Sequence, residues 1–159
     1  MAPRLKRFLD DRALRYELVN HPVTHNSRET AMAADVDADR LAKAVLVESE
    51  ARRLLVVIPA AHRLELGSVH RALGVEVGLA TRLEVERTFE DCVDGAVPAA
   101  GQAYGLEVLV DDALLEAGDV YFEAGDRTEL VKMSGAEFRA LMSSQPHGAF
   151  SVHAPRRGA

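Results

Sequence analysis

The five consecutive apolar residues Leu54–Ile58, followed at once by Pro59, constrain the fold of this chain more than any other stretch. A continuous apolar run of this length, stopped by a proline, is typical of a strand that is fully buried inside a protein. A second apolar stretch, Ala44–Val47, precedes it, and the segment between the two has the length of a hairpin connection. The two stretches therefore predict a pair of adjacent strands within a sheet.

Helices and further strands are predicted around this pair. Apolar residues recur at helical spacing or alternate as in strands, and Ser27, Thr81 with Glu84, and Ser134 with Glu137 resemble helix N-caps. The expected helical segments are 4–14, 28–34, 37–41, 66–73, 81–89 and 134–142, and the expected further strands are 16–19, 75–79, 106–110, 120–122 and 129–133. This order predicts an α/β or α+β fold, with one domain over residues 1–150 and a short flexible tail over 151–159.

Composition excludes several classes of protein. The chain has 159 residues, 48% of them hydrophobic, which is enough for one domain with a core of its own. Its formal net charge of −6 does not suit a protein that coats nucleic acid. The basic start has no apolar segment typical of a secretory signal, and no apolar run reaches membrane-spanning length. We therefore expect a cytoplasmic protein that does not associate with membranes.

Cysteine and histidine chemistry is not indicated. Cys92 is the single cysteine, so a disulfide framework is excluded, and its acidic neighbours Glu90, Asp91 and Asp94 should raise the pKa of the thiol. His21 and His25 are four residues apart, but Pro22 between them prevents a shared helix face. We therefore predict neither a nucleophilic cysteine nor a metal site. A histidine could still line a pocket, although a polar loop residue is the more common role.

Lys43 and the loop 92–101, CVDGAVPAAG, are the features that suggest chemistry. Lys43 lies among apolar residues where a helical turn enters a strong strand, so it is either a snorkelling residue or a cation that faces a pocket. The residue pattern favours neither. In the loop, glycines allow backbone N–H groups to approach a ligand, and Pro98 stiffens the chain. Such a loop could bind a developing oxyanion, although most such stretches are only turns.

Four segments in sequence order carry a resemblance to a known family, and together they run from about Tyr16 to Met142. They read NHPVTHNSRETAMAADVDADRLAKAVLV, LLVVIPAAHRLELGSVHRALG, LATRLEVERTFEDCVDGAVPAAGQAYGLEVLVDDALL and VYFEAGDRTELVKMSGAEFRAL. They include a lysine at position 43 and a Gly-x-x-Pro loop. The chain thus resembles the YbaK family, also called prolyl-tRNA-synthetase-associated editing domains.

This resemblance implies a mixed, strongly curved sheet flanked by helices, and trans-editing hydrolysis of the ester of a mischarged aminoacyl-tRNA. It implies no metal, no other cofactor and no covalent nucleophile, and the partner would be the aminoacylated tRNA acceptor end. Lys43 would lie near the tRNA 3′ end, at its phosphate, while the amides of Gly95, Ala96 and Val97 would hold the carbonyl and Pro98 would stiffen the loop. The further residues implied in substrate binding are His21, His25, Ser27, Thr30, Gly101, Gly125 and Asp126.

One departure from the family pattern bears on the substrate. The family loop commonly continues Pro-Pro-Phe-Gly, whereas this chain has Pro98-Ala99-Ala100-Gly101, which predicts either a wider pocket or a looser loop. Two alternatives to the deacylase remain: a binding module that holds an aminoacyl-like ligand or a protein without hydrolysis, and a purely structural domain. The structural domain would place Lys43 far from the loop, with no cavity between them.

Overall fold

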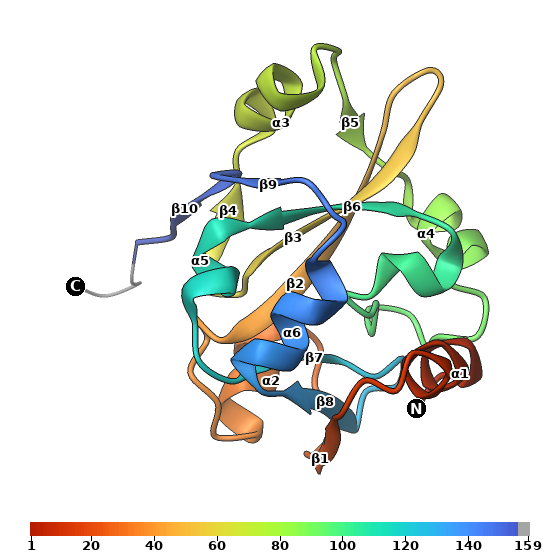
Figure 1. Ribbon diagram of the computed structural model, residues 1–159, viewed down its shortest axis with the longest axis vertical. Coiled ribbons are helices and arrows are strands. Elements are labelled where there is room, and N and C mark those ends of the chain that lie inside the picture. Colours follow the sequence, from red (N-terminus) through yellow and green to blue (C-terminus); the bar gives the residue numbers. More distant parts are fainter. Residues whose placement is uncertain (156–159) are drawn as a thin grey trace.

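The structure, a computed structural model, describes residues 1–155 of the chain as strands around which helices are packed (Figure 1). The strands are β1 Glu17–Asn20, β2 Leu41–Glu48, β3 Arg53–Pro59, β4 His62–Leu64, β5 Gly78–Leu79, β6 Glu107–Asp111, β7 Val120–Glu123, β8 Glu129–Met133, β9 His147–Gly148 and β10 Ser151–His153. The helices are α1 Pro3–Asp11, α2 Ser27–Ala33, α3 Leu66–Leu73, α4 Arg82–Thr88, α5 Asp112–Glu116 and α6 Gly135–Met142, with a 3₁₀ helix, η1, at Gly101–Tyr104.

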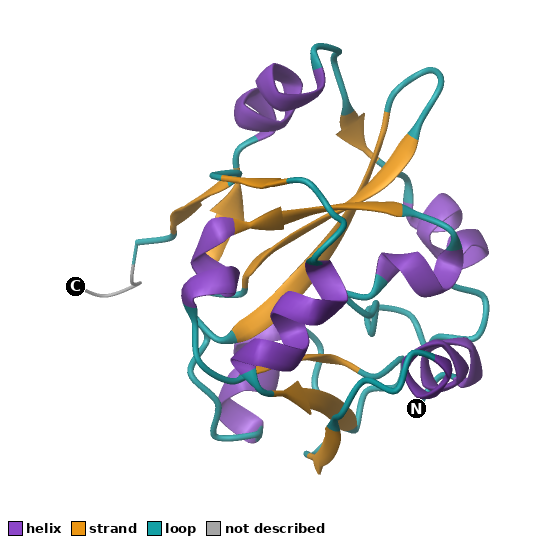
Figure 2. Cartoon of the chain, in the orientation of Figure 1, coloured by secondary structure: helices purple, strands orange, loops and turns teal. Residues whose placement is uncertain are grey.

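Eight of the strands form one mixed sheet, and β4 pairs with β10 in a second, two-stranded sheet (Figure 2). The order in the large sheet is β1-β8-β7-β2-β3-β6-β9, and β5 pairs with the far end of β2. The contacts β2–β7, β3–β6 and β6–β9 are parallel, whereas β2–β3, β7–β8 and β1–β8 are antiparallel. The predicted fold class, a mixed sheet with flanking helices in one domain, is therefore confirmed.

β3 is buried on both faces, as its apolar run predicts. Leu55 and Val57 point into the core that α1, α5 and α6 cover, while Val56 and Ile58 point into a second core under α3. All four side chains have no exposed surface. Because β2 and β6 flank β3 on both edges, this strand lies in the centre of the sheet. The adjacent strand β2 contains Ala42 and Lys43, so these two residues also lie near the centre of the sheet.

Most local predictions are confirmed, and the differences have physical reasons. The αL glycine after α3 (Gly74, φ 70°) and the caps Thr81 and Ser134 are found as expected. The cap of α2 is Asn26 rather than Ser27, because the Asn26 side chain accepts from the backbone N–H of Glu29. α1 ends at Asp11, short of the predicted end at residue 14. The segment 37–41 contains a hydrogen-bonded turn and then the start of β2.

The end of the chain differs from the prediction. Ser151–His153, predicted to be part of a flexible tail, form β10 and pair antiparallel with β4. The backbone N–H of Ala154 also donates to the carbonyl of Ala61. The last part of the predicted tail, residues 156–159, lies outside the described residues. Among residues 1–155, no helix is long and apolar enough to cross a membrane.

Candidate functional site

A cavity of about 220 Å³ lies where β2 begins, beside the end of β7 and the loop that follows α4. The parallel pair Ala42–Phe122 joins the two strands, so Lys43 and Glu123 follow it at equivalent positions on neighbouring strands. The cavity is lined by Ser27, Leu41, Ala42, Lys43, Ala44, Gly95, Val97 and Glu123. Segments that are far apart in the sequence thus place a cation, a carboxyl group and loop backbone around one space.

Lys43 is the cation of this cavity. Its side chain is half-buried, and Nζ donates to the carbonyl oxygen of His62 at 3.2 Å. Burial lowers the pKa of Lys43 below that of a free lysine, and the neighbouring positive charge of Arg28 lowers it further. Because Lys43 and the loop line the same cavity, the separation expected for a purely structural domain is not found. Of the two interpretations open from sequence, the pocket cation fits this position.

Glu123 is the carboxyl group of the cavity, and the sequence did not single it out. Its Oε1 lies 3.5 Å from the hydroxyl of Thr30, whereas its buried Oε2 has no hydrogen-bond partner within residues 1–155. Burial raises the pKa of Glu123 to about 7, with a small further contribution from the charge of Asp126. A carboxyl group with this pKa exchanges its proton near neutral pH, which is the property that general acid–base catalysis requires.

The loop after α4 contributes Gly95 and Val97 to the lining of the cavity. Gly95 has φ +83°, a conformation that residues with a Cβ rarely adopt, so a glycine is needed here. The N–H of Ala96 donates to the carbonyl of Val93 at 3.0 Å and is therefore already used in a turn. The N–H groups of Gly95 and Val97 have no partner within the described chain. The predicted set of three binding amides is thus reduced to two that are free to donate to a ligand.

Two contacts hold this loop against the turn between β7 and β8. The N–H of Val93 donates to the carbonyl of Gly125 at 2.8 Å, and Nε of Arg127 donates to the carbonyl of Asp94, also at 2.8 Å. The Asp94 side chain also pairs with Arg82 of α4. The first half of the loop is thereby attached to the strand pair that carries Glu123, which fixes the free amides relative to the carboxyl group.

The second half of the loop is part of the core. Pro98 is buried, and Ala99 and Ala100 have no exposed surface at all and pack in the core beside Phe89. Gly101 starts η1, where a Cβ would lie 2.9 Å from the Val108 side chain. The loop is therefore not loosely held, so the alternative of a looser loop is wrong. Ala96 and Pro98 are buried and anchor the loop in the core, and Gly101 is required for close packing.

The other predicted site residues fall into two groups. Ser27 lines the main cavity, while His25 and Thr30 line a small recess beside it that also borders Gly95 and Glu123. His21, Gly125 and Asp126 line neither space.

Each residue of the second group has a contact elsewhere. His21 is buried, with Nδ1 2.7 Å from the carbonyl oxygen of Pro22. Gly125 (φ +97°) packs against Ala2, where a Cβ would lie only 2.5 Å from the Ala2 Cβ. Asp126 accepts hydrogen bonds from the amine of Met1 and the N–H of Thr128, and these bonds lower its pKa although burial opposes them. These three residues shape the surroundings of the cavity and do not border it.

Arg127 is the second residue that the sequence analysis did not place in the site. It borders the recess, and its Nη1 lies 3.4 Å from Nδ1 of His25. A basic residue after a glycine turn has no distinctive sequence signal, and neither has an acidic residue at the end of a short strand. The register between β2 and β7 shows that Glu123 lies beside Lys43, and the contact with Asp94 shows that Arg127 lies beside the loop.

Cys92 has the elevated thiol pKa that the sequence predicts, but the main cause is different. Its pKa is raised to about 11, chiefly by burial, and the charge of Asp91 adds to the effect. Sγ lies 3.3 Å from the Tyr104 hydroxyl, which in turn donates to Asp91 at 2.8 Å. A thiol of this pKa is protonated at neutral pH, so Cys92 packs between α4 and η1 and does not act as a nucleophile.

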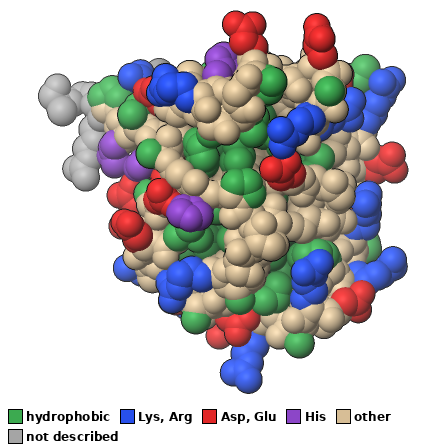
Figure 3. All heavy atoms as spheres, turned by 45° about the horizontal axis from the view of Figure 1, so that its top comes forward, with side chains coloured by type: hydrophobic (Ala, Val, Ile, Leu, Met, Phe, Trp, Pro, Cys, Tyr) green, Lys and Arg blue, Asp and Glu red, His purple; other side chains and the backbone are tan. Residues whose placement is uncertain are grey.

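Hollows of about 460 and 620 Å³ occur elsewhere on the surface, and the glycine loop lines neither of them. A further hollow of about 260 Å³ is lined by Gly95 and Val97, but neither Lys43 nor Glu123 borders it. On the face drawn in Figure 3, basic and acidic side chains are interspersed, so this face has no broad positive area. The combination of a lysine, an unpaired carboxyl group and free amides makes the 220 Å³ cavity the best candidate for chemistry.

Comparison with known proteins gives the family and the fold of the chain. Residues 21–141 match a family described as the aminoacyl-tRNA editing domain. A structure described as a trans-editing enzyme for prolyl-tRNA synthetase superposes with TM-score 0.82 and 25% identity, over 96% of this chain and 97% of that chain. A search of curated proteins found no match to the sequence.

Two further structures show the same fold. The hypothetical protein APE2540 superposes with TM-score 0.83 and 24% identity, over 94% of this chain and 99% of that chain. A protein from Marinobacter aquaeolei VT8, described as acting in signal transduction, gives TM-score 0.77 and 21% identity, over 96% of this chain but 31% of that chain. The fold therefore occurs both as a separate chain and within a longer one.

Proposed function

Because this chain belongs to the aminoacyl-tRNA editing domain family, we propose that it hydrolyses the ester bond of mischarged aminoacyl-tRNA, acting in trans. The observation that carries the proposal is the joint lining of one cavity by Lys43, Glu123 and the loop at Gly95 and Val97. The partner is the tRNA acceptor end, and a cytoplasmic location is part of the same proposal.

The substrate is held by charge and by backbone donors. Lys43 binds the phosphate next to the terminal nucleotide, and Arg28 adds positive charge beside it. The free N–H groups of Gly95 and Val97 donate to the carbonyl oxygen of the ester and stabilise the negative charge that develops there. Because these amides are fixed before the substrate arrives, little reorganisation is needed in the transition state.

Glu123 is proposed as the general base. In its ionised form it takes a proton from a water molecule as the water oxygen attacks the ester carbonyl carbon. The bond between this carbon and the ribose oxygen then breaks, and the proton passes from Glu123 to the departing ribose oxygen. The products are the free amino acid and the uncharged tRNA, and no step requires a metal ion.

The size of the cavity favours a small amino acid. Its volume of about 220 Å³ is below the roughly 300–1,000 Å³ typical of sites for drug-sized ligands. The cavity can hold the aminoacyl group only if most of the terminal adenosine stays outside. We therefore expect the highest activity with tRNAs that carry small residues.

A panel of mischarged tRNAs tests the function. The purified protein should release at least one small amino acid faster than buffer does, and at a lower rate after Glu123→Gln. The variant Glu107→Gln, which changes an exposed carboxylate on β6, is the matched control and should leave the rate unchanged. Binding of a non-hydrolysable aminoacyl-adenosine analogue without release of any amino acid from the panel would instead identify a binding module and contradict the proposal.

A further inference from the structure

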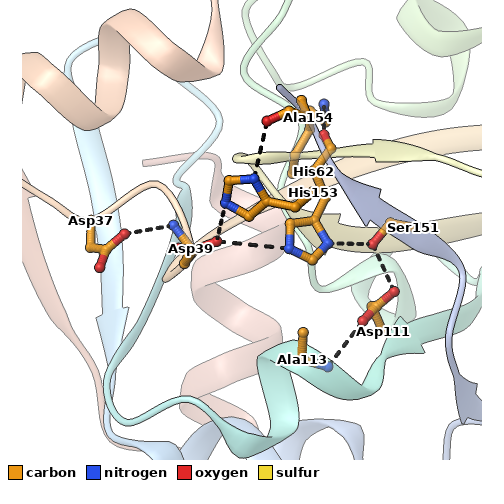
Figure 4. Close-up of polar contacts among 9 residues, drawn as sticks. Asp37, Asp39, His62, Asp111, Ala113, Ser151, His153 and Ala154 are labelled. Atoms are coloured by element: carbon orange, nitrogen blue, oxygen red, sulfur yellow. Dashed lines mark hydrogen bonds and ion pairs between the residues drawn. The ribbon is translucent and has the colours of Figure 1, made fainter. Parts of the chain in front are cut away.

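Two histidines and one aspartate meet at a place that the proposed reaction does not use. Asp39 lies in the turn before β2, His62 in β4 and His153 in β10, and Figure 4 shows the three side chains pointing toward one another. One ligand-type atom from each lies within 4.8 Å of the others. The spacing of histidines in the sequence predicted no metal site, since these three residues come from distant segments.

The hydrogen bonds of both imidazoles determine which ring nitrogen faces Asp39. Nδ1 of His153 lies 3.0 Å from the carbonyl oxygen of Ala154, and because a carbonyl only accepts, this nitrogen carries a proton. In a neutral imidazole the other nitrogen, Nε2, then has a free lone pair. This Nε2 lies 3.6 Å from Oδ1 of Asp39.

Hydrogen bonds that link His62 to Ser151, and Ser151 to Asp111, determine in the same way which ring nitrogen of His62 carries a proton (Figure 4). The Ser151 hydroxyl donates to the carboxylate of Asp111 at 2.8 Å, so its oxygen can only accept from Nδ1 of His62, 2.9 Å away. Asp111 is itself buried and accepts from the N–H of Phe150 at 2.9 Å. Nε2 of His62 therefore also presents a lone pair, 3.7 Å from the same Oδ1 of Asp39.

With both imidazoles neutral, three lone-pair donors therefore face one another. The separations of 3.6 and 3.7 Å are too long for hydrogen bonds. They are close to the distance between neighbouring ligands of a tetrahedral zinc ion, which is about 3.3 Å for bonds of about 2.0 Å. Such an arrangement of acceptors is favourable when a positive charge lies among them, either a metal ion or a proton on one imidazole.

The backbone around the three residues holds them in place. The N–H of Asp39 donates to the side chain of Asp37, and the N–H of Ala61 donates to the carbonyl of Ala38. The carbonyl of His62 accepts from Lys43, which fixes β4 from the other side. The second ring nitrogen of each histidine is also hydrogen-bonded, to Ser151 in His62 and to the carbonyl of Ala154 in His153. Hydrogen bonds from the second ring nitrogen accompany most histidine metal sites.

We propose that Asp39, His62 and His153 bind a divalent transition-metal ion, with Zn²⁺ as the natural occupant. Imidazole nitrogen and carboxylate oxygen are ligands that suit Zn²⁺, and water would complete the coordination. The ion ties β10 and β4 to the turn before β2. Asp39 and His153 also border the 620 Å³ hollow, so the fourth position is open to solvent.

Calorimetric titration of the full chain, free of any polyhistidine tag, with ZnCl₂ tests the site. We expect one ion per chain and a higher melting temperature when the ion is bound. His62→Ala, His153→Ala and Asp39→Asn should each weaken binding by about 100-fold or more, and Ser151→Ala by about 10- to 100-fold, since it only orients His62. His147→Ala is the matched control, because His147 is also exposed and paired with an aspartate, Asp112.

Cobalt gives a second readout. Co²⁺ bound by the parent should show the intense visible absorption of a tetrahedral ion, and His153→Ala should lose it. His153 is half-exposed at a sheet edge, so this variant keeps the test valid even if His62→Ala fails to fold. Parent protein that binds Zn²⁺ no more tightly than His153→Ala, or His147→Ala that loses binding equally, would overturn the proposal.

Discussion

At the scale of single residues, the proposed site depends on the carboxyl group of Glu123, whose pKa lies near neutral pH. Glu123 lines the cavity with Lys43, yet the two do not form an ion pair within 4 Å in the described structure. Burial without an ion pair accounts for the high pKa of Glu123, and burial also accounts for the low pKa of Lys43. Burial of both charged groups therefore costs stability, and the pKa of Glu123 places its proton exchange near neutral pH.

The stability of the Glu123→Gln variant tests this view. The pKa of Glu123 is about 7 when folded against a usual value of 4.5, so the folded state binds more protons between these pH values. Its carboxyl group therefore lowers stability progressively as pH rises from 4.5 to 7. Glu123→Gln should match the parent near pH 4.5 and be more stable above pH 7, by up to about 3 kcal/mol. Urea unfolding at pH 4.5 and 8 measures this, and an equal difference at both pH values would contradict it.

The pH dependence of hydrolysis follows from the same group. A general base must be ionised, so the rate of the parent should increase with pH up to about 7 and then level off. Glu123→Gln should lose this dependence and be slower by about 10²- to 10⁴-fold at pH 8. Single-turnover rates from pH 5.5 to 8.5 measure both effects, with the spontaneous hydrolysis of the ester subtracted. A parent profile without an inflection near pH 7 would exclude Glu123 as the base.

At the scale of elements, the loop after α4 is the proposed donor of amides. Gly95 and Gly105 both have positive φ, +83° and +71°, so alanine is strained at either position, by roughly 1–2 kcal/mol. Only Gly95 lines the cavity, whereas nothing lies near a Cβ at Gly105. We expect Gly95→Ala to reduce hydrolysis by about 10-fold or more, and Gly105→Ala to cost similar stability without this loss. Rates and thermal melts of both variants measure the difference, and equal rates would contradict the role of the loop.

The elements that could be predicted from sequence are those with local causes. The buried strand β3 has an apolar run, and α4 and α6 have capping residues that are visible in the sequence. The short elements α5, β4, β9 and β10 are not predicted from the sequence. The three strands exist through pairing with distant segments, while α5 has a local cap but is only five residues long. α5 is capped by Asp111, whose carboxylate also accepts from Phe150, and β10 is stabilised by pairing with β4.

Part of the site could be predicted from the sequence, whereas the rest depends on contacts between distant segments. Lys43, Gly95 and Val97 were predicted from a resemblance, and they line one cavity in the structure. Glu123 could not be predicted, because its position depends on the parallel register of β2 and β7. The cluster of Asp39, His62 and His153 joins three segments, so no spacing rule within one segment reveals it.

At the scale of the whole molecule, the proposed function requires an acidic protein to bind the polyanion tRNA through few contacts. The formal net charge is −6, and the positive groups beside the cavity are Lys43, Arg28 and Arg127. Each phosphate neutralised on a single strand contributes about 0.7 to the slope of log affinity against log salt. We therefore expect a slope of magnitude about 2 for binding of uncharged tRNA, measured by fluorescence anisotropy from 50 to 300 mM salt. A slope of about 6 or more would indicate a broad basic surface instead.

The most direct test of the central claim is the single-turnover hydrolysis of a mischarged tRNA by the parent, Lys43→Ala and Lys132→Ala. Lys132 is the matched control, since it is also a partly buried strand lysine but faces Asp119 outside the cavity. If the cavity at Lys43 is the active site, Lys43→Ala should be slower by about 100-fold or more while Lys132→Ala matches the parent. Lys43→Ala that hydrolyses the ester as fast as the parent, with the fold intact by circular dichroism, would contradict the account.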